Sequence, residues 1–319
     1  MSKILSYIGE YMEGNAWEGL CVQCYHSRYL NDHYRPVPAM QGGDAGIEGF
    51  TQNGITHQCY CPEREYTDDK LYDHQRDKLT EDMKKLINNA KRLQGMGVPL
   101  IREWHFVIPE YKDSRILVHA ESKRQEVLKA KKENPLAYAH IADDFQIIIK
   151  TAESFKPEIS RIVRTTLTNM RLNLAVLHAD NPDWSKCDSQ KAANIRRKIK
   201  AVMHLDDDSN DDLVAVIDIY GEYYLSGIEV MNNLRIAFPE IHEEVYRLEQ
   251  SYKREVFART RMNTNRTMNQ ALFDDILNQF QAKLEKDFSH MFTIGSIGEL
   301  KQDMIAGWLA DCSMEFRSA

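Results

Sequence analysis

Asp44, Glu48 and Gln58 have the types and spacing of oxygen ligands for a hard metal ion. Glycines near Asp44 on both sides let the backbone bring its carboxylate close to a bound ion or phosphate. Asn53-Gly54, between two short extended runs, predicts a hairpin in which the start of one strand lies beside the end of the other. Glu48 opens the first run and Gln58 closes the second, so their oxygen atoms can converge. Such a set suits Mg²⁺ or Mn²⁺, which activates water and neutralises phosphoryl charge.

A further carboxylate is available upstream, because Glu18 follows Trp17 near the start of a predicted helix. The predicted metal ligands are therefore Asp44, Glu48 and Gln58, together with Glu18. The same pattern would also arise from a glycine-rich turn with solvated acids, and the two interpretations remain open at this point.

The elements around this segment predict an α/β layout. Apolar residues at helical spacing in the first 30 residues are interrupted at Gly14, which predicts two helices. The segment 31–46 is rich in proline and glycine and is expected to be a loop. The hairpin is then followed by a helix from Thr67 to Leu93, a strand at 100–109, a helix at 113–132 and a strand at 145–151. We expect a mixed sheet flanked by helices.

The character of the sequence changes after residue 155. Apolar residues recur at helical spacing, and the segment 212–234 is long enough to be a buried helix in spite of its β-branched residues. The sequence therefore predicts an α/β domain over residues 1–155 and an all-α domain over residues 156–319.

The composition is that of a globular protein, with 43% hydrophobic and 28% charged residues. No apolar run approaches the roughly 20 residues that span a bilayer, and residues 1–15 lack the features of a signal peptide. Six dispersed cysteines do not form a disulfide framework, so we expect a cytosolic protein without a membrane segment.

The net charge of −7 argues against a protein that coats nucleic acid through bulk charge, but a local basic groove remains compatible with it. Three basic clusters would serve such a groove or would be solvated helix faces: Lys84, Lys85, Lys91 and Arg92, then Lys129–Lys132, then Arg196–Lys200.

The order of these elements resembles the restriction-endonuclease-like nuclease core, known as PD-(D/E)xK, and within it the Mrr-type branch. The resemblance covers about residues 10 to 150. In it Glu18 corresponds to the helix glutamate, and Asp44 and Glu48 correspond to the two acids of the phrase G-x-D-x-G-I-D, with Glu48 in place of the second aspartate. Gln58 corresponds to the first residue of Q-x-K.

Tyr60 stands where this family has its lysine. The resulting variant, Q-x-Y-x-P, resembles nuclease modules of bacterial anti-phage systems, including those with ABC-type ATPase partners. The resemblance implies a DNA substrate, an ATPase or sensor partner bound through the helical domain, and oligomerisation on activation. The chain has no G-x-x-x-x-G-K-[ST] motif, so we expect any dependence on ATP to come from such a partner.

An ammonium group from the next helix can replace the family's lysine. Lys78 borders the predicted apolar stripe of that helix, and Asp82 lies four residues on and can pair with it. Lys70 is a second candidate, although it lies in the first turn, and Lys78 would equally fit a lysine that extends along its own helix. The apolar stripe consists of Leu71, Leu79, Leu86 and Leu93.

The cysteines raise the alternative of a zinc site, because Cys21-x2-Cys24 has acceptable ligand spacing. Cys59 and Cys61 alternate along one strand and also fit a buried strand face. The complete set of candidate zinc ligands is Cys21, Cys24, His26, His57, Cys59 and Cys61.

The sequence thus predicts an Mg²⁺-dependent DNA endonuclease, the effector of an anti-phage complex that is held inactive until triggered. Glu48, Asp44 and Gln58 would organise the metal, and Lys78, or Tyr60 through its hydroxyl, would orient the attacking water or stabilise phosphoryl charge. The alternative is a nuclease-like structural or adaptor subunit that has lost its lysine and is catalytically inactive.

Overall fold

The computed structural model describes residues 3–8, 14–38, 45–165, 170–174 and 183–317. The chain divides into two compact units, Met1–Ile162 and Val163–Ala319. The first unit contains a mixed five-stranded sheet with helices, and the second is mostly helical, so the predicted fold class is confirmed.

The sheet of the first unit has the strand order β1-β2-β3-β4-β5, which is also the order of the strands along the chain. The strand β2 is antiparallel to both of its neighbours, β1 and β3, whereas β3, β4 and β5 are parallel. The parallel strands are joined through helices, as such connections require. The strands are β1 (Arg35–Pro36), β2 (Gly49–Phe50), β3 (Ile55–Cys59), β4 (Ile101–Val107) and β5 (Ile141–Lys150).

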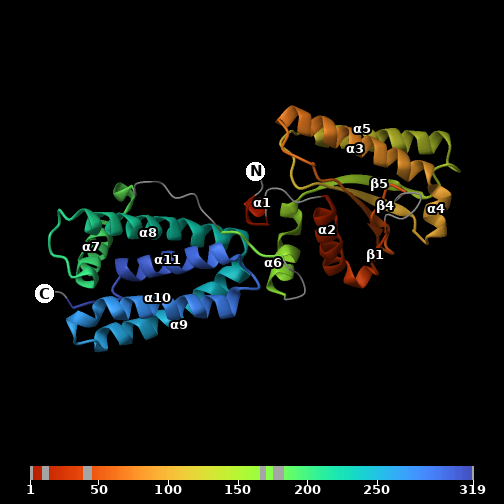
Figure 1. The fold of residues 1–319 in the computed structure, drawn as a ribbon. Coiled ribbons are helices and arrows are strands. Elements are labelled where there is room, and N and C mark those ends of the chain that lie inside the picture. Colours follow the sequence, from red (N-terminus) through yellow and green to blue (C-terminus); the bar gives the residue numbers. More distant parts are fainter. Residues whose placement is uncertain (1–2, 9–13, 39–44, 166–169, 175–182, 318–319) are drawn as a thin grey trace. The chain divides into compact units, whose positions relative to one another are not determined.

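Helices cover both faces of this sheet (Figure 1). The helices α3 and α5 lie on one face, and α2 lies on the other. Successive side chains of a strand point to opposite faces, so Trp104 and Phe106 enter the core beneath α3 and α5, while His105 faces α2. The helices of this unit are α1 (Lys3–Ile8), α2 (Gly14–Arg28), α3 (Asp68–Asn88), α4 (Ala90–Gly95) and α5 (Arg115–Glu133), and α6 (Lys156–Arg164) carries the chain across the boundary into the second unit.

Two element predictions are wrong in detail. Arg35–Pro36 was expected in a loop but pairs with β2, because proline is tolerated in an edge strand whose N–H side is unpaired. The single helix predicted to extend from Thr67 to Leu93 ends at Asn88. Asn89 has a non-helical backbone (φ −104°, ψ 24°), and its side-chain Nδ2 donates to the Lys85 carbonyl at 2.7 Å.

The predicted hairpin is present, and a left-handed glycine closes its turn. Gly54 has φ 93°, and its N–H donates to the Thr51 carbonyl at 3.2 Å. Of Asn53 and Gly54 only Gly54 has positive φ, and the Thr51 N–H donates to the Ile55 carbonyl at 2.8 Å, so Gln52, Asn53 and Gly54 form the loop. The Gly54 carbonyl accepts from the N–H groups of Arg102 and Glu103, which aligns β3 with β4.

The second unit is built around α11, which packs against α7, α8 and α10. The helix predicted at 212–234 is present as α8, but it is buried along one side only, since Val214, Ile219, Ile228 and Ile236 are exposed. None of the described helices has the length and apolar composition that a membrane-spanning segment needs. The helices of this unit are α7 (Ser189–Met203), α8 (Asp211–Ala237), α9 (Pro239–Met262), α10 (Asn269–Phe288) and α11 (Ile294–Ala310).

One lysine of the basic cluster at 196–200 does not belong to a solvated face. Lys198 is fully buried, and its Nζ donates to the carbonyls of Trp308 (3.4 Å) and Asp311, at the end of α11. The last carbonyls of a helix lack partners within it, so Lys198 caps α11 from α7. Burial lowers the pKa of Lys198 to about 8.

Because of this buried lysine, the free energy of unfolding is expected to increase with pH in the alkaline range. Between a folded pKa of about 8 and an unfolded pKa of 10.5, the unfolded chain holds a proton that the folded chain has released, so a rise in pH favours folding. We expect the unfolding free energy of the wild type, minus that of Lys198→Met, to increase by about 2 kcal/mol between pH 7 and pH 9.5. Urea denaturation of both chains at the two pH values measures this difference.

Arg196→Met, on the same helix, is the control, because an arginine keeps its charge throughout this pH range. A difference for Lys198→Met that stays constant with pH would contradict the expected titration.

Candidate active site

Glu48 occupies the centre of the candidate site, directly before β2. Its carboxylate is buried, with 8% of the residue exposed, and accepts two hydrogen bonds. Gln58 Nε2 donates to Oε1 at 2.9 Å, and the main-chain N–H of Cys59 donates to Oε2 at 3.1 Å. The hairpin makes this possible, because the Glu48 N–H donates to the His57 carbonyl at 2.7 Å and so aligns the start of one strand with the end of the other. The structure thus brings Glu48 and Gln58 together.

Glu18, the upstream carboxylate, lies on α2 and is half-buried. Burial is the main cause that raises the pKa of the Cys21 thiol, and the charges of Glu48 and Glu18 both add to it. The same two carboxylates contribute to raising the pKa of Tyr34, again after burial. Glu18 and Glu48, from elements far apart in the sequence, therefore act electrostatically on the same side chains.

Gln58 supports the carboxylate of Glu48 in this arrangement. The amide nitrogen of Gln58, and not its oxygen, is hydrogen-bonded to Glu48. The side chain of Gln58 therefore orients the Glu48 carboxylate by donating to it, whereas the sequence predicted an oxygen ligand for the metal. Asp44, the other predicted acid, lies outside the described residues.

Tyr60 follows β3 and is half-buried against the core beneath α3 and α5. Its ring is nearly parallel to that of Phe106, with the ring centroids 6.4 Å apart. Burial is the first cause that raises the pKa of Tyr60 to about 12. The hydroxyl is therefore neutral at physiological pH, and Tyr60 does not supply the positive charge of the lysine whose place it takes.

Lys78 forms the expected ion pair with Asp82. Its Nζ lies 2.9 Å from Asp82 Oδ2, and Lys85 Nζ lies 3.1 Å from Oδ1. The side chain of Asp82 is fully buried, whereas 28% of the Lys78 side chain is exposed. Burial raises the pKa of Asp82 and the two lysines oppose that effect. Lys78 therefore has its ammonium fixed at the edge of the buried stripe, and the exposed Lys70 has no described contact of this kind.

The glycine-rich segment before Glu48 meets α3 at Gly46. This residue has φ 84°, and a Cβ there would lie 2.5 Å from the Asp82 carbonyl and 2.7 Å from the Leu86 nitrogen. The Gly46 carbonyl accepts a hydrogen bond from Trp104 Nε1 at 2.9 Å. Gly46 is thus held between α3 and β4, which places the chain leading into Glu48 directly beneath Asp82.

The direction of α3 places Lys78 toward the same edge of the sheet as Gln58. Gln75 Nε2 donates to the carbonyl of Glu110 beyond the end of β4, so α3 runs opposite to β4. Lys78 comes before Asp82 and Leu86, the α3 residues whose backbone meets Gly46. Phe106, the partner of Gln58 in the sheet, lies two residues beyond Trp104, which binds Gly46. Lys78 and Gln58 therefore lie on the same side of Gly46 along the sheet.

The opposite face of β3 carries a cluster of buried side chains. His57 is fully buried, its ring stacks on that of Tyr25 with the centroids 3.9 Å apart, and its Nε2 lies 2.8 Å from the Tyr34 hydroxyl. The ligand atoms of Glu48, His57 and Cys59 all lie within 4.8 Å of one another. Of the candidate zinc ligands among the described residues, Cys21, Cys24, His26 and Cys61 do not belong to this group.

The sequence analysis missed one pair of polar residues on β4. His105 Nε2 lies 2.8 Å from Glu103 Oε2, and His105 Nδ1 lies 2.7 Å from the Tyr25 hydroxyl. The signal was the alternation of Glu103 and His105 with the apolar Trp104 and Phe106, which places both polar residues on one face.

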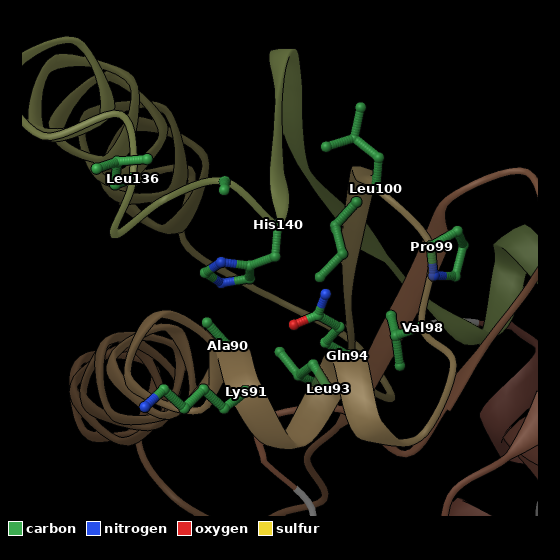
Figure 2. Close-up of a pocket in the computed structure, with 11 residues that line it drawn as sticks. Ala90, Lys91, Leu93, Gln94, Val98, Pro99, Leu100, Leu136 and His140 are labelled. Carbon is green, nitrogen blue, oxygen red and sulfur yellow. The ribbon is translucent and has the colours of Figure 1, made fainter.

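A separate pocket lies at the other end of the sheet (Figure 2). It has a volume of about 330 Å³ and is lined by residues at the amino ends of β4 and β5, including Ile101 and His140, together with Leu93 and Gln94 of α4. Because β3, β4 and β5 are parallel, Gln58 and Cys59 lie at the opposite edge. The pocket is therefore not part of the candidate site.

Comparisons of the chain with models of protein families, with curated proteins and with solved structures found no match.

The contact between Gly46 and α3 predicts that any side chain at position 46 destabilises the fold. We expect Gly46→Ala to lower the unfolding free energy by at least about 3 kcal/mol, from left-handed strain and from the clash with the α3 backbone. Urea denaturation followed by circular dichroism measures the loss.

Two glycines of the same unit separate these causes. Gly97 has φ 78° but open space around it, so Gly97→Ala should cost about 1 kcal/mol through strain alone. Gly95 has neither feature, and Gly95→Ala should be close to neutral. Equal losses for Gly46→Ala and Gly97→Ala would contradict the close approach of α3.

Proposed function

We propose that the chain is a metal-dependent endonuclease that cuts DNA. The observation that supports this most is the buried Glu48 carboxylate, which Gln58 and the Cys59 N–H hold in one orientation. Glu18 on α2 offers a second carboxylate, and Lys78 on α3 offers an ammonium group. Carboxylates and an ammonium group are the groups that metal-assisted hydrolysis of a phosphodiester needs.

The donors at this point fit a hard cation. Glu18 and Glu48 offer carboxylate oxygens, and Mg²⁺ and Mn²⁺ prefer such ligands. Gln58 and the Cys59 N–H hold the Glu48 carboxylate in one orientation, which lowers the reorganisation needed on binding. Bound there, the ion would activate a water for attack on phosphorus. Asp44 is proposed as a further ligand on the strength of the sequence resemblance alone.

Lys78 is proposed to stabilise the negative charge that develops on the phosphoryl group. Asp82 orients the Lys78 ammonium group. Since the single negative charge of Asp82 is shared between Lys78 and Lys85, a net positive charge remains on this cluster. A fixed positive charge at the edge of a buried region is worth more to a transition state than a solvated one.

The resemblance to nuclease modules of anti-phage systems extends the proposal to regulation. The chain would be the effector of a defence complex, with the helical unit as the surface that binds an ATPase or sensor partner. Oligomerisation on activation would bring two sites to the two strands of DNA.

Tyr60 favours the second candidate function, a catalytically inactive nuclease-like subunit. A neutral tyrosine, partly packed into the core, occupies the position of the family's lysine. If Lys78 does not reach the phosphodiester, the chain would retain the fold and the acids without the activity.

Cleavage of DNA by a matched set of variants distinguishes these functions. We expect the wild type, with its genomic partners and Mg²⁺ or Mn²⁺, to cut DNA, and both Glu48→Ala and Lys78→Ala to cut at least about a hundredfold more slowly. Arg102→Ala, which removes an exposed positive charge at the opposite edge of the sheet, is the control and should cut at the wild-type rate.

If the wild type never cuts DNA under these conditions, the inactive subunit is the correct function. If Glu48→Ala cuts as fast as the wild type, the assignment of the site is wrong.

Tyr60→Phe tests which residue replaces the lysine. The substitution removes only the hydroxyl and keeps the ring against Phe106, so we expect a change in cleavage rate of less than about twofold. A loss as large as that of Lys78→Ala, with an unchanged thermal midpoint, would assign the role to the Tyr60 hydroxyl instead.

A further inference from the structure

The cluster on the α2 face of β3 has the donors of a different kind of metal site. Glu48, His57 and Cys59 are all buried, and one ligand atom from each lies within 4.8 Å of the others. A carboxylate oxygen, an imidazole nitrogen and a thiol are the set that soft or borderline cations such as Zn²⁺ prefer.

The distances suit one shared ion. Cys59 Sγ lies 3.7 Å from His57 Nδ1. Two such ligands on a tetrahedral Zn²⁺ are about 3.5 Å apart, given Zn–S of about 2.3 Å and Zn–N of about 2.0 Å. A shift of a few tenths of an ångström would therefore complete this pair around an ion.

His57 is held in the orientation that a ligand needs. Its Nε2 hydrogen-bonds with the Tyr34 hydroxyl at 2.8 Å, and its ring stacks on Tyr25. When Nε2 carries the proton and donates to Tyr34, the lone pair of Nδ1 points toward Cys59. Metal-binding histidines in general donate their other ring nitrogen to such a partner.

Cys21 of α2 is the fourth donor of the proposed set. It is buried, and its thiol and that of Cys59 each affect the pKa of the other. Together with the group formed by Glu48, His57 and Cys59, it gives one carboxylate, two thiols and one imidazole, all buried. Free thiols packed only for their bulk would not need an acid among them.

We propose that Cys21, Glu48, His57 and Cys59 form a binding site for a soft divalent cation such as Zn²⁺. Binding releases the protons of the two thiols, and the +2 charge of the ion then offsets two of the three negative charges of the two thiolates and the carboxylate. Glu48 belongs both to this set and to the oxygen ligands proposed for Mg²⁺, so the two ions compete for it.

Cobalt binding tests the site without any assay of cleavage. The reduced, chelator-treated full chain is titrated with Co²⁺ in buffer free of Mg²⁺. We expect one Co²⁺ per chain, a thiolate-to-cobalt charge-transfer band in the near ultraviolet, and displacement by one equivalent of Zn²⁺. Cys59→Ala should weaken binding at least tenfold, and Cys21→Ala should reduce the band per bound ion because one thiolate is lost. Cys312→Ala, which removes an exposed cysteine of the second unit, should change neither.

The proposal is overturned if the wild type shows no such band, or if Cys59→Ala retains both the band and the affinity. Circular dichroism identifies any variant that does not fold. In that case the charge-transfer band and stoichiometry of the wild type, compared with Cys312→Ala, decide whether the site binds the cation. The outcome is independent of nuclease activity, since a chain that binds Co²⁺ as expected but cuts no DNA would contradict the proposed function alone.

Discussion

The first unit depends on the way one buried carboxylate is held. Glu48 is almost fully removed from solvent, and an acid in that position is costly unless its oxygens accept hydrogen bonds. Gln58 and the Cys59 N–H provide them, one to each oxygen. Both donors come from the end of β3, so this contact holds the direction of the acid and joins the start of β2 to the end of β3. The turn at Gly54 and the pairing of β3 with β4 carry this alignment into the rest of the sheet.

The same strand presents different chemistry on its two faces. Gln58 and Tyr60 face α3 and α5, where Lys78 and Asp82 form an ion pair at the edge of the apolar stripe. His57 and Cys59 face α2, where thiols and aromatic rings surround them. Glu48 has neighbours on both faces: its carboxylate accepts from Gln58 and lies within 4.8 Å of the ligand atoms of His57 and Cys59. Glu48 therefore belongs to both of the proposed metal sites.

The sequence predicted the elements whose signals are local. The Asn-Gly turn, the leucine stripe of α3 and the apolar strand β4 all appear where their patterns placed them, and the pairing of Lys78 with Asp82 follows from helical spacing. Features that depend on partners distant in the sequence were missed. The edge strand β1 exists only because β2 lies beside it, and Lys198 is buried only because α11 ends over α7. The amide of Gln58 faces Glu48 as a donor, which no spacing rule could reveal.

Calorimetric titration with Mn²⁺ shows whether Glu48, oriented by Gln58, is a metal ligand. We predict that the wild type binds Mn²⁺ and that Glu48→Gln, which keeps the size of the side chain but removes its charge, binds at least about tenfold more weakly. Glu63→Gln, which removes an exposed carboxylate shortly after β3, should bind as the wild type does. Equal affinities of the wild type and Glu48→Gln for Mn²⁺ would show that Glu48 is not a metal ligand.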